Sequence, residues 1–155
     1  MGGLIIGIIT TFILLFPKTS YSTVYDDLYK KYSNHAGVDW KLLKAISINE
    51  SSQRFTSVNE DEGRGRKSYG LMQILYPDTL DFINDYYGYE YTRNDLLNPE
   101  INIFLASSYI RYLKTRYNKI SDIIASYNAG SVIKRNGLYI NQTYVNKILK
   151  VYRSI

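Results

Sequence analysis

The chain has 155 residues, 45% of them hydrophobic and 21% charged, which is typical of one folded globular domain and argues against disorder. Nineteen Lys and Arg against fourteen Asp and Glu give a net charge of +5, which suits a polyanion such as nucleic acid, anionic lipid or cell-wall polymer. The absence of Cys excludes disulfides and thiolate zinc sites, and the single His35 cannot build a His-based metal site without carboxylates. We therefore expect one domain whose chemistry needs neither a metal nor a cofactor.

The N-terminus begins with an uncharged, mostly apolar run over residues 2–16. This run is shorter than the roughly 20 residues that cross a bilayer as a helix, so it is more typical of a signal-peptide core. Pro17 ends the run, and Ser20 and Ser22 are small residues where a signal peptidase requires them. We expect cleavage after Ser22.

This interpretation divides the chain into a signal peptide at residues 1–22 and a mature domain at residues 23–155. Cleavage removes only Lys18 among the charged residues, which leaves eighteen positive and fourteen negative residues and a net charge of +4. No Lys or Arg precedes the apolar run, although signal peptides usually begin with a charged segment. A short membrane anchor, or a transient membrane association through residues 2–16, therefore remains the second interpretation.

Beyond residue 22 the apolar residues recur at spacings of three and four, which predicts a mostly α domain. Asp39 and the pair Asn98-Pro99 are typical helix starts, Ser121 is expected to cap a short apolar helix, and Gly88 and Gly130 are expected to follow helix ends. The longer apolar stripes are Val24, Tyr25, Leu28, Tyr29 and Tyr32; Leu42, Leu43 and Ile46; Leu80, Ile83, Tyr86 and Tyr87; Ile101, Phe104, Leu105, Tyr109, Tyr112 and Leu113; and Tyr144, Val145, Ile148, Leu149 and Tyr152.

The helical spacing stops between Ser51 and Tyr69, where glycines and charges predict a long loop or small hairpin. Long loops in compact domains are often functional. His35, just before Ala36-Gly37, is also expected in a loop.

Glu50 is the candidate for chemistry, because it ends the apolar stripe of the second helix. Cleavage of a glycosidic bond needs a carboxylic acid that stays protonated near neutral pH. Burial and the negative end of the helix dipole both favour the neutral acid. A glutamate at a helix end is nevertheless most often a solvated residue, so the case for Glu50 depends on the motifs that follow it.

Those motifs form an ordered set that resembles the lysozyme-like lytic transglycosylases of the soluble (SLT) type. The set consists of Glu50-Ser51, Gly70-Leu71-Met72-Gln73 with Pro77 and Thr79, the segment from Asp95 to Asn102, Ser126-Tyr127-Asn128-Ala129-Gly130, and Tyr144-Val145-Asn146-Lys147-Ile148. Each motif alone is weak, but together and in order they are highly specific. The resemblance implies a lysozyme-like single domain with a long loop or small hairpin after the catalytic helix.

The resemblance also implies an activity and residue roles. The expected enzyme cleaves the β-1,4 bond between N-acetylmuramic acid and N-acetylglucosamine in peptidoglycan glycan strands and leaves 1,6-anhydro ends. Glu50 would act as both acid and base. The expected substrate-binding residues are Gln73, Tyr127 and Asn128 around Glu50 and the N-acetyl group, Ser51 in support of the loop after the helix, and Met72 on the sugar site. A place in the core is an equal alternative for Met72.

Two departures from the family pattern bear on the reaction. Arg66-Lys67-Ser68-Tyr69 stands where the family often has small residues, and the stretch from Glu50 to Gln73 is several residues longer than usual. The longer stretch contains Glu60, Asp61 and Glu62, and a carboxylate there would allow a muramidase that uses water. A solvated acidic run offset by Arg64 and Arg66 is the simpler interpretation.

Three further expectations concern partners and place. Tyr86, Tyr87, Tyr89 and Tyr91 are candidates for exposed aromatic residues near the cleft. A nucleic-acid partner is not expected, because no helix carries a Lys/Arg face long enough to follow phosphates. Glycan strands as substrate imply an exported protein in the periplasm or at the cell wall, with membrane anchoring or a place in a virion as alternatives.

Overall fold

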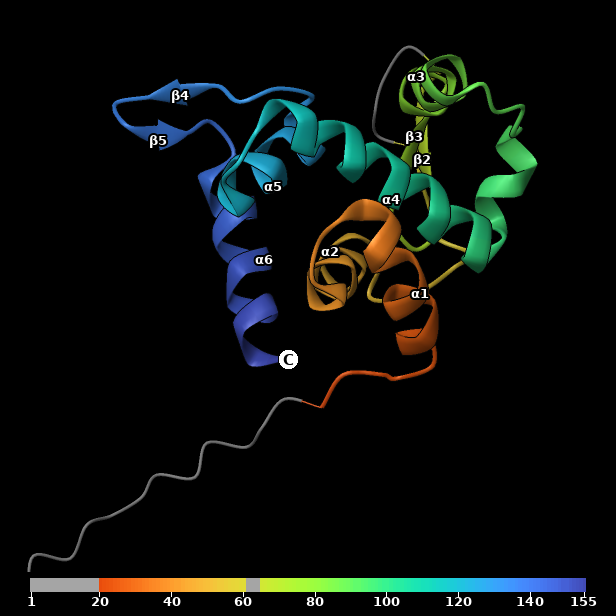
Figure 1. Cartoon of the computed structure of the whole chain (residues 1–155), viewed down its shortest axis with the longest axis horizontal. Helices are drawn as coiled ribbons and strands as arrows, with labels where there is room; N and C mark the ends of the chain where they lie inside the picture. The colour runs from red at the N-terminus through yellow and green to blue at the C-terminus, as the bar shows by residue number, and fades with distance from the viewer. Residues whose placement is uncertain (1–19, 61–64) are drawn as a thin grey trace, which may run out of the picture.

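The computed structural model describes residues 20–60 and 65–155, and their fold is mostly helical (Figure 1). The α-helices are α1 (Asp26–Ala36), α2 (Trp40–Ser51), α3 (Asp78–Tyr87), α4 (Pro99–Arg116), α5 (Ile120–Ala129) and α6 (Gln142–Ser154), with a 3-10 helix at Arg93–Leu97. The strands are β1 (Val58–Asn59), β2 (Lys67–Tyr69), β3 (Ile74–Tyr76), β4 (Lys134–Arg135) and β5 (Leu138–Tyr139). Within these residues, no helix is both long enough and apolar enough to cross a membrane.

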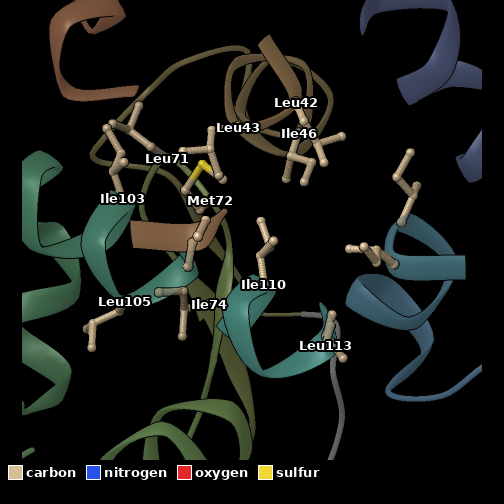
Figure 2. Close-up of a cluster of buried hydrophobic side chains, with 14 of the residues drawn as sticks. Leu42, Leu43, Ile46, Leu71, Met72, Ile74, Ile103, Leu105, Ile110 and Leu113 are labelled. Carbon is tan, nitrogen blue, oxygen red and sulfur yellow. The ribbon is translucent and has the colours of Figure 1, made fainter. Parts of the chain in front are cut away.

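The core lies where α4 meets the helices on either side of it. Helix α4 packs against α1, α3 and α5, and α2 packs against α1 and α6. Figure 2 shows Leu42, Leu43 and Ile46 of α2 on one side of a cluster that includes Ile103, Ile110 and Leu113 of α4, with Leu71 and Met72 near Leu43; Leu105 and Ile74 lie on the side of α4 away from α2. All of these side chains are at most 2% exposed, which makes their burial the main stabilising contribution.

Most helix boundaries follow the local signals in the sequence. Asp39 caps α2 by accepting a hydrogen bond from the Lys41 amide at 3.0 Å, and Asn98 caps α4 in the same way, ahead of Pro99. Gly88 ends α3 in the left-handed conformation, with φ 69°. The expectation for Ser121 is wrong, because α5 begins at Ile120, one residue earlier, and Ser121 lies inside the helix.

His35 also differs from its expected place in a loop. It lies in the last turn of α1, where its Nε2 is 3.0 Å from the Ser108 hydroxyl of α4. Its ring packs against Phe104, with 5.2 Å between the ring centroids. The side chain therefore joins α1 to α4.

The segment after α2 contains short antiparallel strands in the order β1-β2-β3. The turn between β2 and β3 is held from α4 by the buried side chain of Asn102. Its Nδ2 donates to the carbonyls of Tyr69 and Leu96, each at 3.0 Å, and its Oδ1 accepts from the Met72 amide at 2.7 Å. Gly70 in this turn has φ 78°, and a Cβ there would lie 2.4 Å from the Leu96 carbonyl oxygen, so the turn requires glycine.

Two elements were not expected from the sequence. One is the 3-10 helix at Arg93–Leu97, and the other is the hairpin of β4 and β5 between α5 and α6. Figure 1 shows this hairpin extending away from the body of the molecule, at the end where α6 begins.

Candidate active site

A cavity of about 440 Å³ lies where α2 ends, between the sheet with the start of α3 and the helices α4 and α5. One wall is polar and carries Arg66, Ser68, Gln73, Asp78 and Thr79. Helices α4 and α5 contribute the rings of Tyr109 and Tyr127 together with Asn128, and Gly130 follows α5. Glu50 lines the same cavity. The space is thus shaped by an acid, hydrogen-bonding groups and aromatic rings, as expected of a sugar site.

Glu50 is the penultimate residue of α2 and is partly buried. The hydroxyl of Tyr144, on α6, donates a hydrogen bond to its Oε1. Burial raises the pKa of Tyr144 well above its ordinary value, and the adjacent Glu50 charge raises it further. Tyr144 therefore keeps its proton, and its hydrogen bond restricts the orientation of the Glu50 side chain.

Tyr127 is the second phenol at Glu50. Its hydroxyl donates to the Met72 carbonyl at 2.8 Å, which joins α5 to the turn after β2. Burial, followed by the charge of Glu50, raises the pKa of Tyr127 well above its ordinary value as well. Both phenols stay neutral at physiological pH, so they add no second negative charge beside Glu50.

Gln73 lies in the turn on the polar wall, in a left-handed conformation with φ 48°. Its Nε2 donates to the carbonyls of Gly70 at 2.8 Å and Ser57 at 3.2 Å. These two bonds fix the orientation of the amide and leave Oε1 as the acceptor that Gln73 can offer a bound sugar.

Of the other expected substrate-binding residues, Asn128 lies at the cavity, whereas Ser51 and Met72 do not line it. Asn128 lines the cavity, and its Oδ1 accepts from Asn141 Nδ2 at 2.9 Å. Ser51 is buried away from the cavity, where its hydroxyl donates to the Leu71 carbonyl at 2.8 Å and accepts from the Arg54 amide after α2 at 3.2 Å. Met72 is fully buried in the core, so its side chain does not line the sugar cavity (Figure 2).

The structure describes one of the three loop carboxylates, Glu60, and this residue lies outside the cavity lining. Glu60 is exposed, pairs with Lys67 Nζ at 2.5 Å and does not line the cavity, and Asp61 and Glu62 lie outside the described residues. Within the described part of the chain, Asp78 at the start of α3 is the other acid that lines the cavity. Its Oδ2 is 3.2 Å from Nη1 of Arg66.

The tyrosines expected near the cleft are in another part of the molecule. Tyr86, Tyr87, Tyr89 and Tyr91 pack against one another and, through Tyr89 and Tyr91, against Phe104. The aromatic residues of the cavity are instead Tyr109 and Tyr127, whose ring centroids are 5.7 Å apart. The prediction that these four tyrosines lie near the cleft is therefore wrong for this cavity. Their rings instead pack together at the end of α3 and in the segment that follows it.

Several cavity residues were missed from the sequence. Ser68 and Tyr109 line the cavity, and Tyr144 reaches Glu50 from the far end of the chain. Tyr144 lies in one of the family-like segments, which was the signal available for it. Among residues 20–60 and 65–155, no cluster of His, Asp and Glu side chains is placed to hold a metal ion.

The model of the transglycosylase SLT domain family matches residues 27–149, which is most of the chain and includes every residue that lines the cavity. The chain belongs to this family. None of the curated proteins matches the chain in sequence.

Three solved structures of lytic transglycosylases are similar to this chain. An inactive mutant of the lytic transglycosylase Slt from Pseudomonas aeruginosa is 20% identical in sequence to the present chain. The match covers 85% of the present chain, with a TM-score of 0.69. The 70 kDa soluble lytic transglycosylase from Escherichia coli is 24% identical over 86%, with a TM-score of 0.61. A complex of the 70 kDa enzyme with bulgecin A is 23% identical over 85%, with a TM-score of 0.59.

These similarities confirm the predicted lytic-transglycosylase fold of the SLT domain. The chain spans only 24% of the length of the Pseudomonas protein and 19% of the Escherichia coli protein. Those proteins are therefore several times longer than this chain.

Proposed function

We propose that the chain is a peptidoglycan lytic transglycosylase that cleaves the β-1,4 bond between N-acetylmuramic acid and N-acetylglucosamine. One observation carries this proposal: among residues 20–60 and 65–155, Glu50 and Asp78 are the acids that line a cavity of about 440 Å³, and Asp78 is paired with Arg66. The match of the transglycosylase SLT domain family over residues 27–149 supports it.

The reaction needs only one carboxyl group. Glu50, protonated, gives its proton to the glycosidic oxygen of the leaving N-acetylglucosamine as the bond from that oxygen to C1 breaks. The ionised Glu50 then takes the proton of the C6 hydroxyl of N-acetylmuramic acid as this oxygen bonds to C1. The acid is regenerated and no water is consumed, so the product is a 1,6-anhydro ring.

The residues around Glu50 hold the sugar and the acid in place for these steps. Gln73 and Asn128 are neutral groups that can hydrogen-bond an N-acetyl group without changing the charge beside Glu50. The Tyr127 hydroxyl donates to the Met72 carbonyl in the turn that carries Gln73, and the Tyr127 side chain lines the cavity. The hydroxyl at C6 is held within the substrate itself, which favours it over a water molecule that must be recruited.

Among residues 20–60 and 65–155, the arrangement of the acids favours this reaction over that of a muramidase. An inverting hydrolase needs a second carboxylate to orient water on the far side of the sugar. Glu60 is paired with Lys67 away from the cavity, and Asp78 is paired with Arg66. Each of these two carboxylates is thus engaged by a cation.

Replacing the acid tests the catalytic role directly. We expect Glu50→Gln to lower the clearing of a peptidoglycan suspension by at least about 100-fold, because the variant keeps the shape of the side chain but has no proton to donate. Glu90→Gln is the matched control, since Glu90 is an exposed glutamate away from the cavity. Clearing by Glu50→Gln near the wild-type rate, with an unchanged circular dichroism spectrum, would exclude Glu50 as the acid.

We further propose that the chain is exported, since its substrate lies outside the cytoplasmic membrane. The apolar run at residues 2–16 and the small residues Ser20 and Ser22 support this proposal. N-terminal sequencing of the protein from an expressing bacterium should begin near Thr23. Soluble cytoplasmic protein that still begins at Met1 would contradict it.

A further inference from the structure

The hairpin of β4 and β5 has an unusual distribution of side chains between its two faces. Lys134 pairs with Tyr139 and Arg135 with Leu138, and the Ile140 amide donates to the Ile133 carbonyl at 3.0 Å. Residues opposite each other in an antiparallel pair share a face, and successive pairs alternate. One face therefore carries Lys134 and Tyr139, and the other, called here the outer face, carries Ile133, Arg135, Leu138 and Ile140.

The polar face is the one that packs on the protein. The Tyr139 hydroxyl donates to Asp122 Oδ1 at 2.5 Å, and Lys134 Nζ lies 3.3 Å from the same oxygen, so both residues are held by α5. The outer face is turned to solvent, with Ile133 45%, Leu138 60% and Ile140 51% exposed. A solvated hairpin normally does the opposite, with its apolar face inward. Three exposed aliphatic side chains on one small face indicate a surface that is covered by a partner.

Helix α6 begins directly after this hairpin and presents a basic surface. Lys147, Lys150 and Arg153 are exposed and recur every three residues, whereas Val145 and Ile148 are buried on the side that packs against α2 and α5. The sequence of α6 contains neither Asp nor Glu. The exposed side of α6, called here the basic face, is therefore suited to an anionic partner.

The opposite end of α6 contacts the beginning of the described chain. The Tyr21 hydroxyl is 3.4 Å from the Ser154 hydroxyl, so Tyr21 lies next to the last turn of α6. Figure 1 shows the hairpin at the opposite end of this helix. The outer face lies at the start of α6, and the basic face runs along the helix from there.

We propose that the outer face of the hairpin and the basic face of α6 form a docking surface for an anionic lipid bilayer. Ile133, Leu138 and Ile140 enter the boundary between headgroups and acyl chains, while the cations of α6 bind lipid phosphates. An anionic wall polymer would match the charges, but it would not dehydrate three aliphatic side chains. Docking of this kind does not depend on glycan cleavage.

A fluorescent label on the hairpin tests the proposal in the full chain, which has no native Cys. We would label Leu138→Cys with an environment-sensitive dye and add vesicles that contain phosphatidylglycerol. The emission should shift to the blue and rise several-fold, because the dye enters an apolar phase. Phosphatidylcholine vesicles alone should cause little change. The control label at Glu90→Cys, in the segment after α3, should not respond to either vesicle.

Charge variants test the contribution of α6. Lys147→Gln and Lys150→Gln should each raise the lipid concentration for half-maximal response about five-fold, whereas Arg93→Gln, outside α6, should leave it unchanged.

Three results would overturn the proposal. The first is sedimentation of the protein with vesicles while the label at Leu138→Cys keeps its emission in buffer, because attachment would then run through residues 2–16 alone. The second is a complete lack of vesicle binding. The third is an unchanged affinity in both lysine variants. None of these results bears on Glu50, and a catalytically inactive chain could still dock.

Discussion

At the scale of single residues, the site is built around one carboxyl group and two phenols. Tyr144 donates to Glu50, and Tyr127 fastens the turn that carries Gln73. The pKa of each phenol is raised by burial and by the Glu50 charge, so each stays neutral and remains a hydrogen-bond donor at physiological pH. Glu50 can therefore change its protonation state while its neighbours keep theirs.

Tyr144 does not line the cavity, which makes it a positioning residue for Glu50. We expect Tyr144→Phe to lower kcat about ten-fold with little change in KM, because Glu50 loses the donor that orients it while the sugar contacts remain. Steady-state kinetics on soluble glycan strands measures both constants. Tyr152→Phe is the matched control on the same helix, because its hydroxyl lies 3.5 Å from Asp39 and away from Glu50. Equal kinetics for Tyr144→Phe and the wild type would show that Glu50 needs no such support.

The residues of the site differ in how far the sequence could predict them. Glu50, Gln73, Tyr127 and Asn128 stand in recognisable motifs, and all of them line the cavity. Ser51 and Met72 stand in the same motifs, but a motif does not say which side chains face inward. The pair of Arg66 and Asp78 and the contact from Tyr144 join segments that are distant in sequence, so no local pattern predicts them.

At the scale of elements, the turn between β2 and β3 controls the shape of the site. Gly70 allows the chain to pass close to the Leu96 carbonyl, and the buried amide of Asn102 bonds to the turn at both of its ends. This turn places Gln73 at the cavity. Because Asn102 of α4 holds the turn, α4 positions Gln73 although the two belong to different segments.

Removal of the Asn102 amide should destabilise the fold. We expect Asn102→Ala to lower the free energy of unfolding by about 3 kcal/mol, because buried backbone groups of Tyr69, Leu96 and Met72 lose their partner. Thermal unfolding followed by circular dichroism should show a midpoint about 10 °C lower. Asn118→Ala provides the control, since Asn118 is exposed between α4 and α5. A midpoint equal to that of the control would mean that the turn holds without α4.

Helices were more predictable than strands for a physical reason. A helix start such as Asp39 or Asn98 depends on neighbours within one turn, so the sequence contains the whole signal. The strands β1, β2 and β3 are two or three residues long and depend on pairing between segments, which periodicity does not reveal. The hairpin of β4 and β5 was missed despite Asn136-Gly137, whose positive φ angles of 51° and 80° fit the tight turn that this dipeptide favours.

At the scale of the whole molecule, five α-helices of the described residues, α2 to α6, contribute side chains around Glu50. The acid comes from α2, the aromatic wall from α4 and α5, part of the polar wall from α3, and the supporting phenol from α6. Among residues 20–60 and 65–155, Glu50 and Asp78 are the acids that line this cavity, and Asp78 is paired with Arg66. The proposed reaction without water rests on this arrangement.

The product of the reaction tests that claim most directly. Purified peptidoglycan is digested with the wild-type chain, treated with borohydride and analysed by mass spectrometry. We predict muropeptides with 1,6-anhydro-muramoyl ends, which are lighter by one water than hydrolytic products and are not reduced by borohydride. Muropeptides that instead carry reducible N-acetylmuramic acid ends would contradict the account and would identify the enzyme as a muramidase, in which a second carboxylate orients water.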